Sequence, residues 1–269
     1  MNSPTNYVLG QSTREQERLM MQARILRPYT EGFFRRAGIS QGMSVLDLGS
    51  GMGDVAILAG DIVGPGGRVI GLERARQRTV EQGCSSRVSF LATNLDDFST
   101  TEQFDAVVGR YVLQYQPDAA ATLRRLTAFL KPGGIVAFHE VDFTCPHPSF
   151  PPCELFDQVV GIVPEVFRRV GLPPDFGRHL GKTFLDAGLP FPTIHAETPV
   201  GGARGSSFYS WIAATVVSVT PRLADLGLSL PSGVVADHTW VAKLEEAAVA
   251  QGCQIVGSTQ FGTWAREPL

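Results

Sequence analysis

Residues 45–54, VLDLGSGMGD, constrain the fold more than any other stretch of the chain. An apolar run ends at Leu48, glycines follow at alternate positions, and a helical pattern begins at Gly53. A strand that enters a helix through such a turn predicts one unit of a parallel α/β sheet. Gly49 and Gly51 have no side chain, so the backbone there can approach a ligand closely.

The alternation of strand and helix patterns continues to about residue 141. We predict strands at 44–48, 68–73, 88–92, 105–109 and 135–141, and helices at 53–60 and from Asp118 to the turn at 131–134. Parallel strands require crossover connections, so this alternation predicts a doubly wound sheet.

The flanking segments are predicted to be more helical. Apolar residues recur at helical spacing after a capping-box pattern at Thr13 and Gln16, and Pro28 is expected to break or restart this helix, which ends near Gly38. After residue 141 we expect a helical stretch at 153–170, a helix ending at 189, a strand at 193–198, a mixed segment at 204–235, a helix at 237–251 and a strand at 254–264.

These patterns suggest three parts of the chain. Residues 1–40 form a helical cap segment, and residues 41–142 form the core of the sheet. Residues 143–269 complete that core and carry insertions near 143–180 and 204–235, which we expect to act as a substrate lid.

Composition excludes several classes of protein. Of 269 residues, 43% are hydrophobic and 18% are charged, as in ordinary globular proteins. The net charge of −3 and the scattered basic residues argue against a nucleic-acid-binding surface. The polar start lacks a signal-peptide core, and no segment has the ~18–20 apolar residues that span a bilayer, so we expect a soluble cytoplasmic protein.

The four cysteines give no sign of a metal or disulfide framework. They lack CxxC spacing and a paired histidine motif, so we expect reduced thiols and no metal. They are Cys84, Cys145, Cys153 and Cys253.

The spacing of the glycine turn distinguishes between two cofactors. The dinucleotide fingerprint GxGxxG ends on a glycine, whereas here the spacing is GxGxG and Asp54 occupies the final position. An anionic pyrophosphate would meet this carboxylate unfavourably, but an adenosyl sulfonium ligand would not. At the end of the next strand, Glu73 is placed to accept hydrogen bonds from ribose hydroxyls.

The chain resembles the class I S-adenosylmethionine-dependent methyltransferases, in particular the bacterial enzymes that act on small molecules. The resemblance covers residues 7–142 and rests on VLDLGSGMGD (45–54), VIGLE (69–73), VSFLATNLDDF (88–98), FDAVVGRYVLQY (104–115) and LKPGGIVAFHE (130–140). Residues 254–268 look like the antiparallel last strand of that fold. The resemblance implies a Rossmann-like sheet in the order 3-2-1-4-5-7-6.

The resemblance also implies which residues hold the cofactor. The turn would line its methionine part and ribose, Glu73 its ribose hydroxyls, and the segment after the third strand its adenine. Residues of the N-terminal segment would close over it and reach its carboxylate. The implied set is Tyr7, Gln22, Arg24, Gly49, Ser50, Gly51, Gly53, Glu73, Asn94, Leu95, Arg110 and Gln114.

Methyl transfer from a sulfonium centre needs mainly alignment of the acceptor and exclusion of water. A general base is required only if the acceptor is a protonated hydroxyl, amine or carbon acid. His139 is the first candidate for that base, although a hydrogen-bonded residue at a strand end is the favoured interpretation of this histidine. Glu140 and Tyr111 are the other catalytic candidates, and the alternation of His139, Glu140 and Asp142 does not by itself indicate a metal site.

The acceptor is expected to be a small apolar or aromatic molecule, because aromatic residues are frequent in both insertions; the alternative is that these residues only seal the insertions against the sheet. Three alternatives stay open: a cofactor-binding enzyme that catalyses a cyclisation or rearrangement without methyl transfer, a nicotinamide-dependent oxidoreductase, and a binding module without activity. The sequence does not distinguish a monomer from a homodimer.

Overall fold

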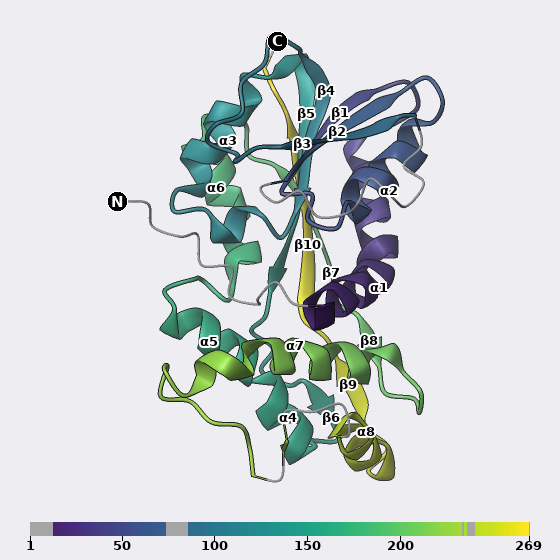
Figure 1. The fold of residues 1–269 in the computed structure, drawn as a ribbon, viewed down its shortest axis with the longest axis vertical. Coiled ribbons are helices and arrows are strands. Elements are labelled where there is room, and N and C mark those ends of the chain that lie inside the picture. Colours follow the sequence, from purple (N-terminus) through teal and green to yellow (C-terminus); the bar gives the residue numbers. More distant parts are fainter. Residues whose placement is uncertain (1–12, 74–85, 233, 236–239, 269) are drawn as a thin grey trace. The chain divides into compact units, whose positions relative to one another are not determined.

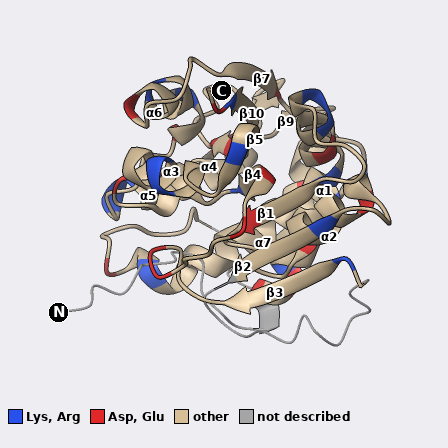
Figure 2. Ribbon diagram, turned by 90° about the horizontal axis from the view of Figure 1, so that it is seen from above, with Lys and Arg blue, Asp and Glu red and all other residues tan. Residues whose placement is uncertain are grey.

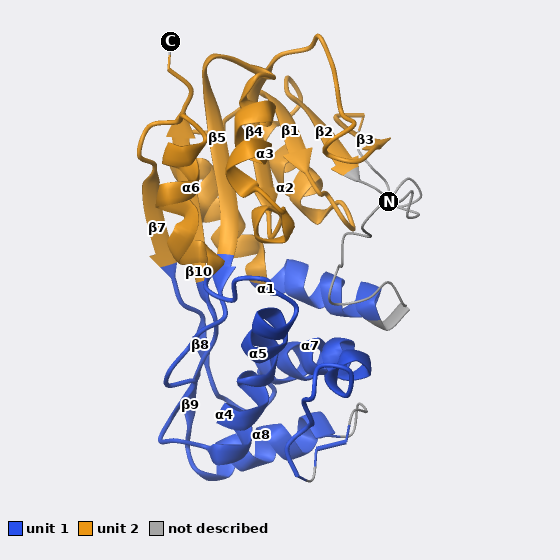
Figure 3. Cartoon of the chain, turned by 90° about the vertical axis from the view of Figure 1, so that its left-hand side faces the viewer, with its two compact units in different colours: residues 1–25, 141–175, 197–259 blue, residues 26–140, 176–196, 260–269 orange. Residues whose placement is uncertain are grey.

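The computed structural model describes residues 13–73, 86–232, 234–235 and 240–268. The chain divides into two compact units, which Figure 3 colours separately. Unit 1 contains residues 1–25, 141–175 and 197–259, and unit 2 contains residues 26–140, 176–196 and 260–269. Each unit is built from segments that are far apart in the sequence.

Unit 2 is organised around a seven-stranded sheet. Its strands are β1 (Ser44–Leu48), β2 (Arg68–Glu73), β3 (Val88–Ala92), β4 (Phe104–Arg110), β5 (Leu130–Asp142), β7 (Thr193–Glu197) and β10 (Thr259–Arg266). They lie in the order β3-β2-β1-β4-β5-β10-β7, with parallel pairing from β3 to β5 and an antiparallel β10. The doubly wound α/β fold and the order 3-2-1-4-5-7-6 are therefore confirmed.

Helices cover both faces of this sheet (Figure 1). On one face, α2 (Asp54–Val63) and the end of α1 (Thr13–Ala37) pack on alternate strand residues such as Val45 and Val108. On the other, α3 (Ala119–Thr127), the 3₁₀ turn Phe176–His179 and α6 (Leu180–Asp186) pack on Leu46, Leu48 and Val107. Alternation of side chains along each strand separates the two apolar clusters.

The expected break at Pro28 is wrong. α1 runs without interruption from Thr13 to Ala37, with the exposed Pro28 inside it. Proline removes one helical hydrogen bond and costs roughly 3 kcal/mol in a helix interior. The complete burial of flanking side chains offsets this loss, since Leu26 is 0%, Phe33 2% and Phe34 1% exposed.

Unit 1 is mainly helical. It contains α4 (Glu154–Val160), α5 (Ile162–Arg169), α7 (Ser207–Leu223) and α8 (Trp240–Ala250). A small antiparallel sheet in the order β6-β9-β8 joins Ser149–Phe150, Gln254–Val256 and Val200–Gly201. No helix in the described residues is long and apolar enough to cross a membrane.

The structure gives more detail for two expected segments of this half of the chain and corrects a third. The stretch 153–170 forms two helices that meet at Gly161, and the mixed segment 204–235 contains the 17-residue helix α7. The single strand expected at 254–264 is two strands, β9 and β10, which belong to different sheets. Gly257 and Ser258 separate them, and Gly257 donates its amide hydrogen to Pro199 outside either strand.

Candidate functional site

The carboxyl ends of the parallel strands bring several predicted residues to one edge of the sheet. Leu48 of β1 pairs with Leu72 of β2 and Gly109 of β4, and Arg110 pairs with His139 of β5. The glycine turn after β1 and Glu73 at the end of β2 therefore lie at the same edge as these residues. In open α/β sheets this is the edge where ligands bind.

The glycine turn has the backbone conformation that its sequence suggested. Gly49, Gly51 and Gly53 have φ angles of 59°, 52° and 82°. A Cβ atom on Gly49 would lie 3.0 Å from Val112 Cγ2, so the turn approaches the loop after β4 closely. At Gly51 the nearest atom to an added Cβ would be 3.9 Å away, an ordinary van der Waals contact, so the backbone leaves room beside this residue.

The buried Ser50 fixes the middle of this turn. Its amide donates to Leu72 O at 2.9 Å and its hydroxyl to Asp47 O at 3.3 Å. Its carbonyl accepts from Gly53 N at 2.7 Å. The turn is thus held by its own backbone and leaves the Gly51 surface available to a ligand.

The start of α2 already carries a negative charge. Asp54, in the first helical turn, forms an ion pair with Arg110, whose side chain is only 5% exposed. A carboxylate at a helix N-terminus occupies the position that a phosphate would otherwise prefer. This arrangement agrees with a cofactor that lacks a pyrophosphate.

Arg110 also begins a chain of hydrogen bonds across unit 2. It donates to Thr30 Oγ1 at 3.3 Å, and this oxygen lies 2.9 Å from His139 Nδ1. His139 Nε2 lies 2.9 Å from Gln260 Oε1, which also accepts from the Tyr111 hydroxyl at 2.5 Å. We call these five residues, Arg110, Thr30, His139, Gln260 and Tyr111, the Arg110–Tyr111 network.

His139 is held as a neutral imidazole in this network. Its complete burial, together with the charge of Arg110, lowers the pKa of His139 from 6.5 to about 3, although the bond to Gln260 opposes the shift. Gln260 Oε1 is an acceptor, so Nε2 carries the hydrogen, and the single hydrogen of the Thr30 hydroxyl is shared between Nδ1 and the Leu26 carbonyl, which lies 3.0 Å from Thr30 Oγ1. A group with this pKa is a poor general base at neutral pH.

Tyr111 lies in a strained backbone conformation directly after β4. Its φ of 56° is the only positive value among the non-glycine residues of the described chain. The ring packs edge-on against His139 with centroids 5.6 Å apart, and the backbone amide donates to His139 O at 2.9 Å. Such conformations persist where surrounding contacts hold them, and they cluster at functional sites.

Glu140 is completely buried and supports the same loop. Its Oε1 accepts from the amides of Val112 at 2.9 Å and Leu113 at 2.8 Å. Desolvation raises the pKa of Glu140 to about 8, against the effect of these backbone bonds. Its Oε2 and both polar atoms of the buried Gln114 amide have no hydrogen-bond partner among the described residues. Unpaired buried groups are costly, so a ligand that pairs with them gains affinity.

The other predicted residues have simpler surroundings. Asn94 is exposed and donates to Asp97, while the Leu95 carbonyl accepts from Arg125. The side chain of Glu73 and all of Tyr7 lie outside the described residues.

Two predicted cofactor residues belong to unit 1. Gln22 is buried on α1, where its Oε1 accepts from Arg18 at 2.8 Å, and Arg24 is exposed on the same helix. The amide nitrogen of Gln22 is therefore the atom of its side chain oriented away from Arg18.

Sequence reasoning missed Thr30 and Gln260, which link His139 to its neighbours. Thr30 lies in no recognisable motif, and the resemblance of residues 254–268 to the last strand gives Gln260 no role in the site. No group of three or more His, Cys, Asp or Glu side chains in the described part of the chain is placed to hold a metal ion.

Residues 39–159 match the model of the family described as a methyltransferase domain. The match covers less than half of the chain, and over this region it supports the resemblance to the class I S-adenosylmethionine-dependent methyltransferases.

Individual relatives agree with this resemblance. The domain region is 32% identical over 124 residues to demethylmenaquinone methyltransferase from Lactococcus lactis, covering 44% of this chain and 48% of that protein. A 37.1 kDa protein of a Streptomyces fradiae transposon is 32% identical over 166 residues, which cover 59% of this chain and 47% of the relative. The chain thus spans about half the length of these curated relatives.

A solved structure shares the fold. Phosphoethanolamine N-methyltransferase 2 from Haemonchus contortus, in complex with S-adenosylhomocysteine, superposes with a TM-score of 0.55 at 18% identity. The match covers 90% of this chain and 53% of that one. At this identity the likeness concerns the fold of the methyltransferase domain alone.

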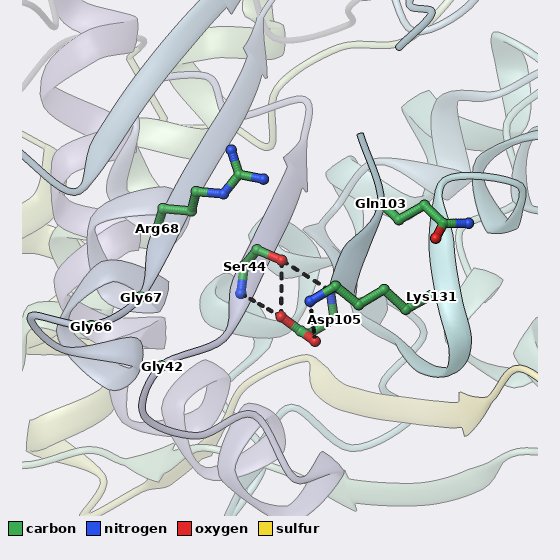
Figure 4. A pocket seen from close by; sticks show the side chains of 8 residues that line it. All are labelled: Gly42, Ser44, Gly66, Gly67, Arg68, Gln103, Asp105 and Lys131. Carbon is green, nitrogen blue, oxygen red and sulfur yellow. Dashed lines mark hydrogen bonds and ion pairs between the residues drawn. The ribbon is translucent and has the colours of Figure 1, made fainter. Parts of the chain in front are cut away.

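A hollow of about 400 Å³ lies at the opposite, amino-terminal edge of the methyltransferase sheet (Figure 4). Its charged groups are already paired with one another, since Asp105 accepts from Lys131 at 2.7 Å and from the Ser44 amide and hydroxyl at 2.7 and 2.9 Å. Arg68, also on its wall, pairs with Glu102 at 2.9 Å. We therefore interpret this hollow as structural.

We expect Asp105→Asn to destabilise the protein by roughly 1–2 kcal/mol, because it removes the charge that three donors share. Burial alone would raise the pKa of Asp105, but hydrogen bonds from Lys131 and Ser44 hold it below its usual value. The additional stability of the parent relative to Asp105→Asn should therefore be lost as pH falls through the lowered pKa of Asp105. Denaturant unfolding at several pH values measures it, with the exposed Asp186→Asn, whose carboxylate pairs with Lys182, as control. Equal losses of unfolding free energy in Asp105→Asn and Asp186→Asn would contradict the structural role that we assign to Asp105.

Proposed function

We propose that this protein binds S-adenosylmethionine at the glycine turn and catalyses methyl transfer to a small-molecule acceptor. The observation that supports this best is the turn itself, whose Gly51 has room for a Cβ atom and lies beside a helix N-terminus that already carries the Asp54 carboxylate. A cofactor with a sulfonium and no phosphate suits such a site better than a dinucleotide.

The residues that would hold the cofactor are those at the carboxyl edge of the sheet. Gly49, Ser50, Gly51 and Gly53 supply a backbone cradle, and Glu73 is placed at the strand end that suits ribose hydroxyls. The buried, unpaired amide of Gln114 fits a polar contact with a ligand. The further proposed contacts are Tyr7, Gln22, Arg24, Asn94, Leu95 and Arg110.

When bound, S-adenosylmethionine supplies a methyl group on an excellent leaving group. The protein then has mainly to orient the acceptor and exclude water, which can lower a barrier by roughly 7–11 kcal/mol. We propose that Tyr111 contacts the acceptor and that His139, through Gln260, positions the Tyr111 hydroxyl. Glu140 positions the loop after β4 through the amides of Val112 and Leu113.

We propose a small apolar or aromatic acceptor. The Lactococcus relative is named for demethylmenaquinone, which agrees with this class. Figure 2 shows basic and acidic residues interspersed along the elements, a distribution that does not favour nucleic acid as acceptor. We further propose that the protein acts in the cytoplasm as a monomer or homodimer.

Calorimetric titration with S-adenosylmethionine, S-adenosylhomocysteine and NADH tests the cofactor. We expect micromolar binding of the first two and none of the third, and NADH binding alone would establish an oxidoreductase. Incubation with candidate aromatic acceptors then tests the reaction by release of S-adenosylhomocysteine. Product formed with the cofactor unchanged would instead establish the cyclisation or rearrangement alternative.

His139 is expected to remain one neutral tautomer, with hydrogen on Nε2, from pH 8 down to about pH 4.5. The reason is its burial, which lowers the pKa of His139 to about 3. Nitrogen-15 NMR of the imidazole measures both the tautomer and the protonation state. A protonation step near 6.5, as in an unperturbed histidine, would restore His139 as a candidate base. If Gln260→Leu lost the nitrogen-15 signals of the tautomer that carries hydrogen on Nε2, the tautomer assignment would be confirmed.

A further inference from the structure

Two buried cysteines of unit 1 lie beside each other although about 100 residues separate them. Cys153 is the N-cap residue of α4, and Cys253 lies between α8 and β9. β6 and β9 pair antiparallel with Phe150 opposite Gln254. Continuing that register by one residue places Pro151 opposite Cys253, which brings the start of α4 to the start of β9.

Side-chain contacts agree with this register. Cys253 Sγ donates to Pro151 O at 3.0 Å, and the Cys253 thiol is also in hydrogen-bonding contact with the side chain of Cys153. Both thiols are free and nearly inaccessible, with exposures of 1% for Cys153 and 4% for Cys253. The third described cysteine, Cys145, is free and partly exposed.

We propose that Cys153 and Cys253 form a dithiol that peroxides oxidise to an intramolecular disulfide. One sulfur, as thiolate, attacks a peroxide oxygen; the O–O bond breaks, and a sulfenic acid and one water result. The second sulfur then attacks the sulfenic sulfur, the S–O bond breaks and a second water leaves. Overall, two thiols are oxidised to one disulfide, and one hydrogen peroxide is reduced to two waters.

Burial determines which oxidant can react and how fast. A small neutral peroxide can enter a site closed to bulky disulfides. Desolvation, together with the neighbouring Cys153 and Asp157, raises the pKa of the Cys253 thiol. Little thiolate is therefore present at neutral pH, and the reaction should accelerate as pH rises.

The disulfide would tie α4 to β9 and close a loop that includes α5, α7 and α8. Closing so long a loop restricts the unfolded chain, so we expect the oxidised protein to melt several degrees higher than the reduced protein. This inference concerns unit 1 alone and does not depend on the proposed methyl transfer.

Peptide mapping of the full-length protein tests the proposal. The protein is treated with hydrogen peroxide at pH 8.5, unfolded, alkylated without reductant and digested. We expect the Cys153 and Cys253 peptides linked to each other, with Cys145 alkylated and the melting temperature raised. The Cys145→Ala variant should give the same link and the same shift, whereas Cys253→Ala should give neither.

Recovery of Cys153 and Cys253 as alkylated thiols after prolonged treatment would overturn the proposal. Separate oxidation of each to sulfinic acid, or a link to Cys145 instead, would overturn it as well. The parent protein alone gives these results, so poor folding of a variant would not remove the test.

Discussion

Gly51→Arg is expected to abolish S-adenosylmethionine binding, with a loss of affinity greater than about 100-fold, or about 2.7 kcal/mol. Gly51 has a φ of 52° and no atom closer than 3.9 Å to an added Cβ, so an arginine would extend into the volume that we assign to the cofactor. The same calorimetric titration measures the loss, and circular dichroism checks that the sheet persists.

Gly42→Arg is the matched control for this substitution. Gly42 has a φ of 84° and no atom within 4 Å of an added Cβ, but it lies at the amino-terminal edge of the sheet. Both variants place an arginine in a left-handed conformation, which costs roughly 1–2 kcal/mol. Equal affinities in the two variants would show that strain and not the cofactor position decides the result.

Glu140→Gln is expected to remove the pH dependence that this carboxyl gives to the free energy of unfolding. Its pKa is raised from 4.5 to about 8, chiefly by desolvation, so folding takes up a proton between these values. The contribution of Glu140 to stability is fully present below pH 4.5 and is lost as pH rises through 8. Glutamine can accept the same backbone bonds without ionising. The free energy of unfolding of the variant, relative to that of the parent, should therefore rise by roughly 4 kcal/mol as pH increases from 4.5 to 8.

Denaturant unfolding of both proteins at each pH measures the difference in their free energies of unfolding. His139 also makes this free energy depend on pH at low pH, but both proteins retain His139, so its contribution cancels in the difference. The control is Glu165→Gln. The exposed Glu165 pairs with Arg169 and Arg168, which lower its pKa, so its variant should show a small difference of opposite sign. If the free energies of unfolding of the parent and of Glu140→Gln changed with pH in parallel, the conclusion that Glu140 is a buried neutral carboxyl would be refuted.

The parallel half of the sheet could be predicted because its sequence is locally consistent. The strands from Ser44 to Ala92 have short apolar runs bounded by turn residues, and their predicted limits match the structure. β5 extends back to Leu130, where a turn was expected, because the strand continues through the glycines at 133 and 134. Pairing with the neighbouring β4 overrides the local preference for a turn.

The candidate site was less accessible to sequence reasoning. The glycine turn has a fixed spacing and a conformation that few residues adopt, so it is recognisable in a single sequence. Thr30, His139 and Gln260 come from a helix and two strands, and only tertiary pairing brings them together. The neutral state of His139 depends on burial, which the residue type does not specify.

The position of β10 between two strands that precede it in the sequence has a consequence for synthesis of the chain. β10 lies between β5 and β7, so these earlier strands gain their shared neighbour only when residues 259–266 have emerged from the ribosome. Until then the nascent protein has an open edge at β5, which can pair with other chains or recruit chaperones. Gln260 is part of this strand, so the hydrogen bonds of Tyr111 and His139 to Gln260 form only after β10 has emerged.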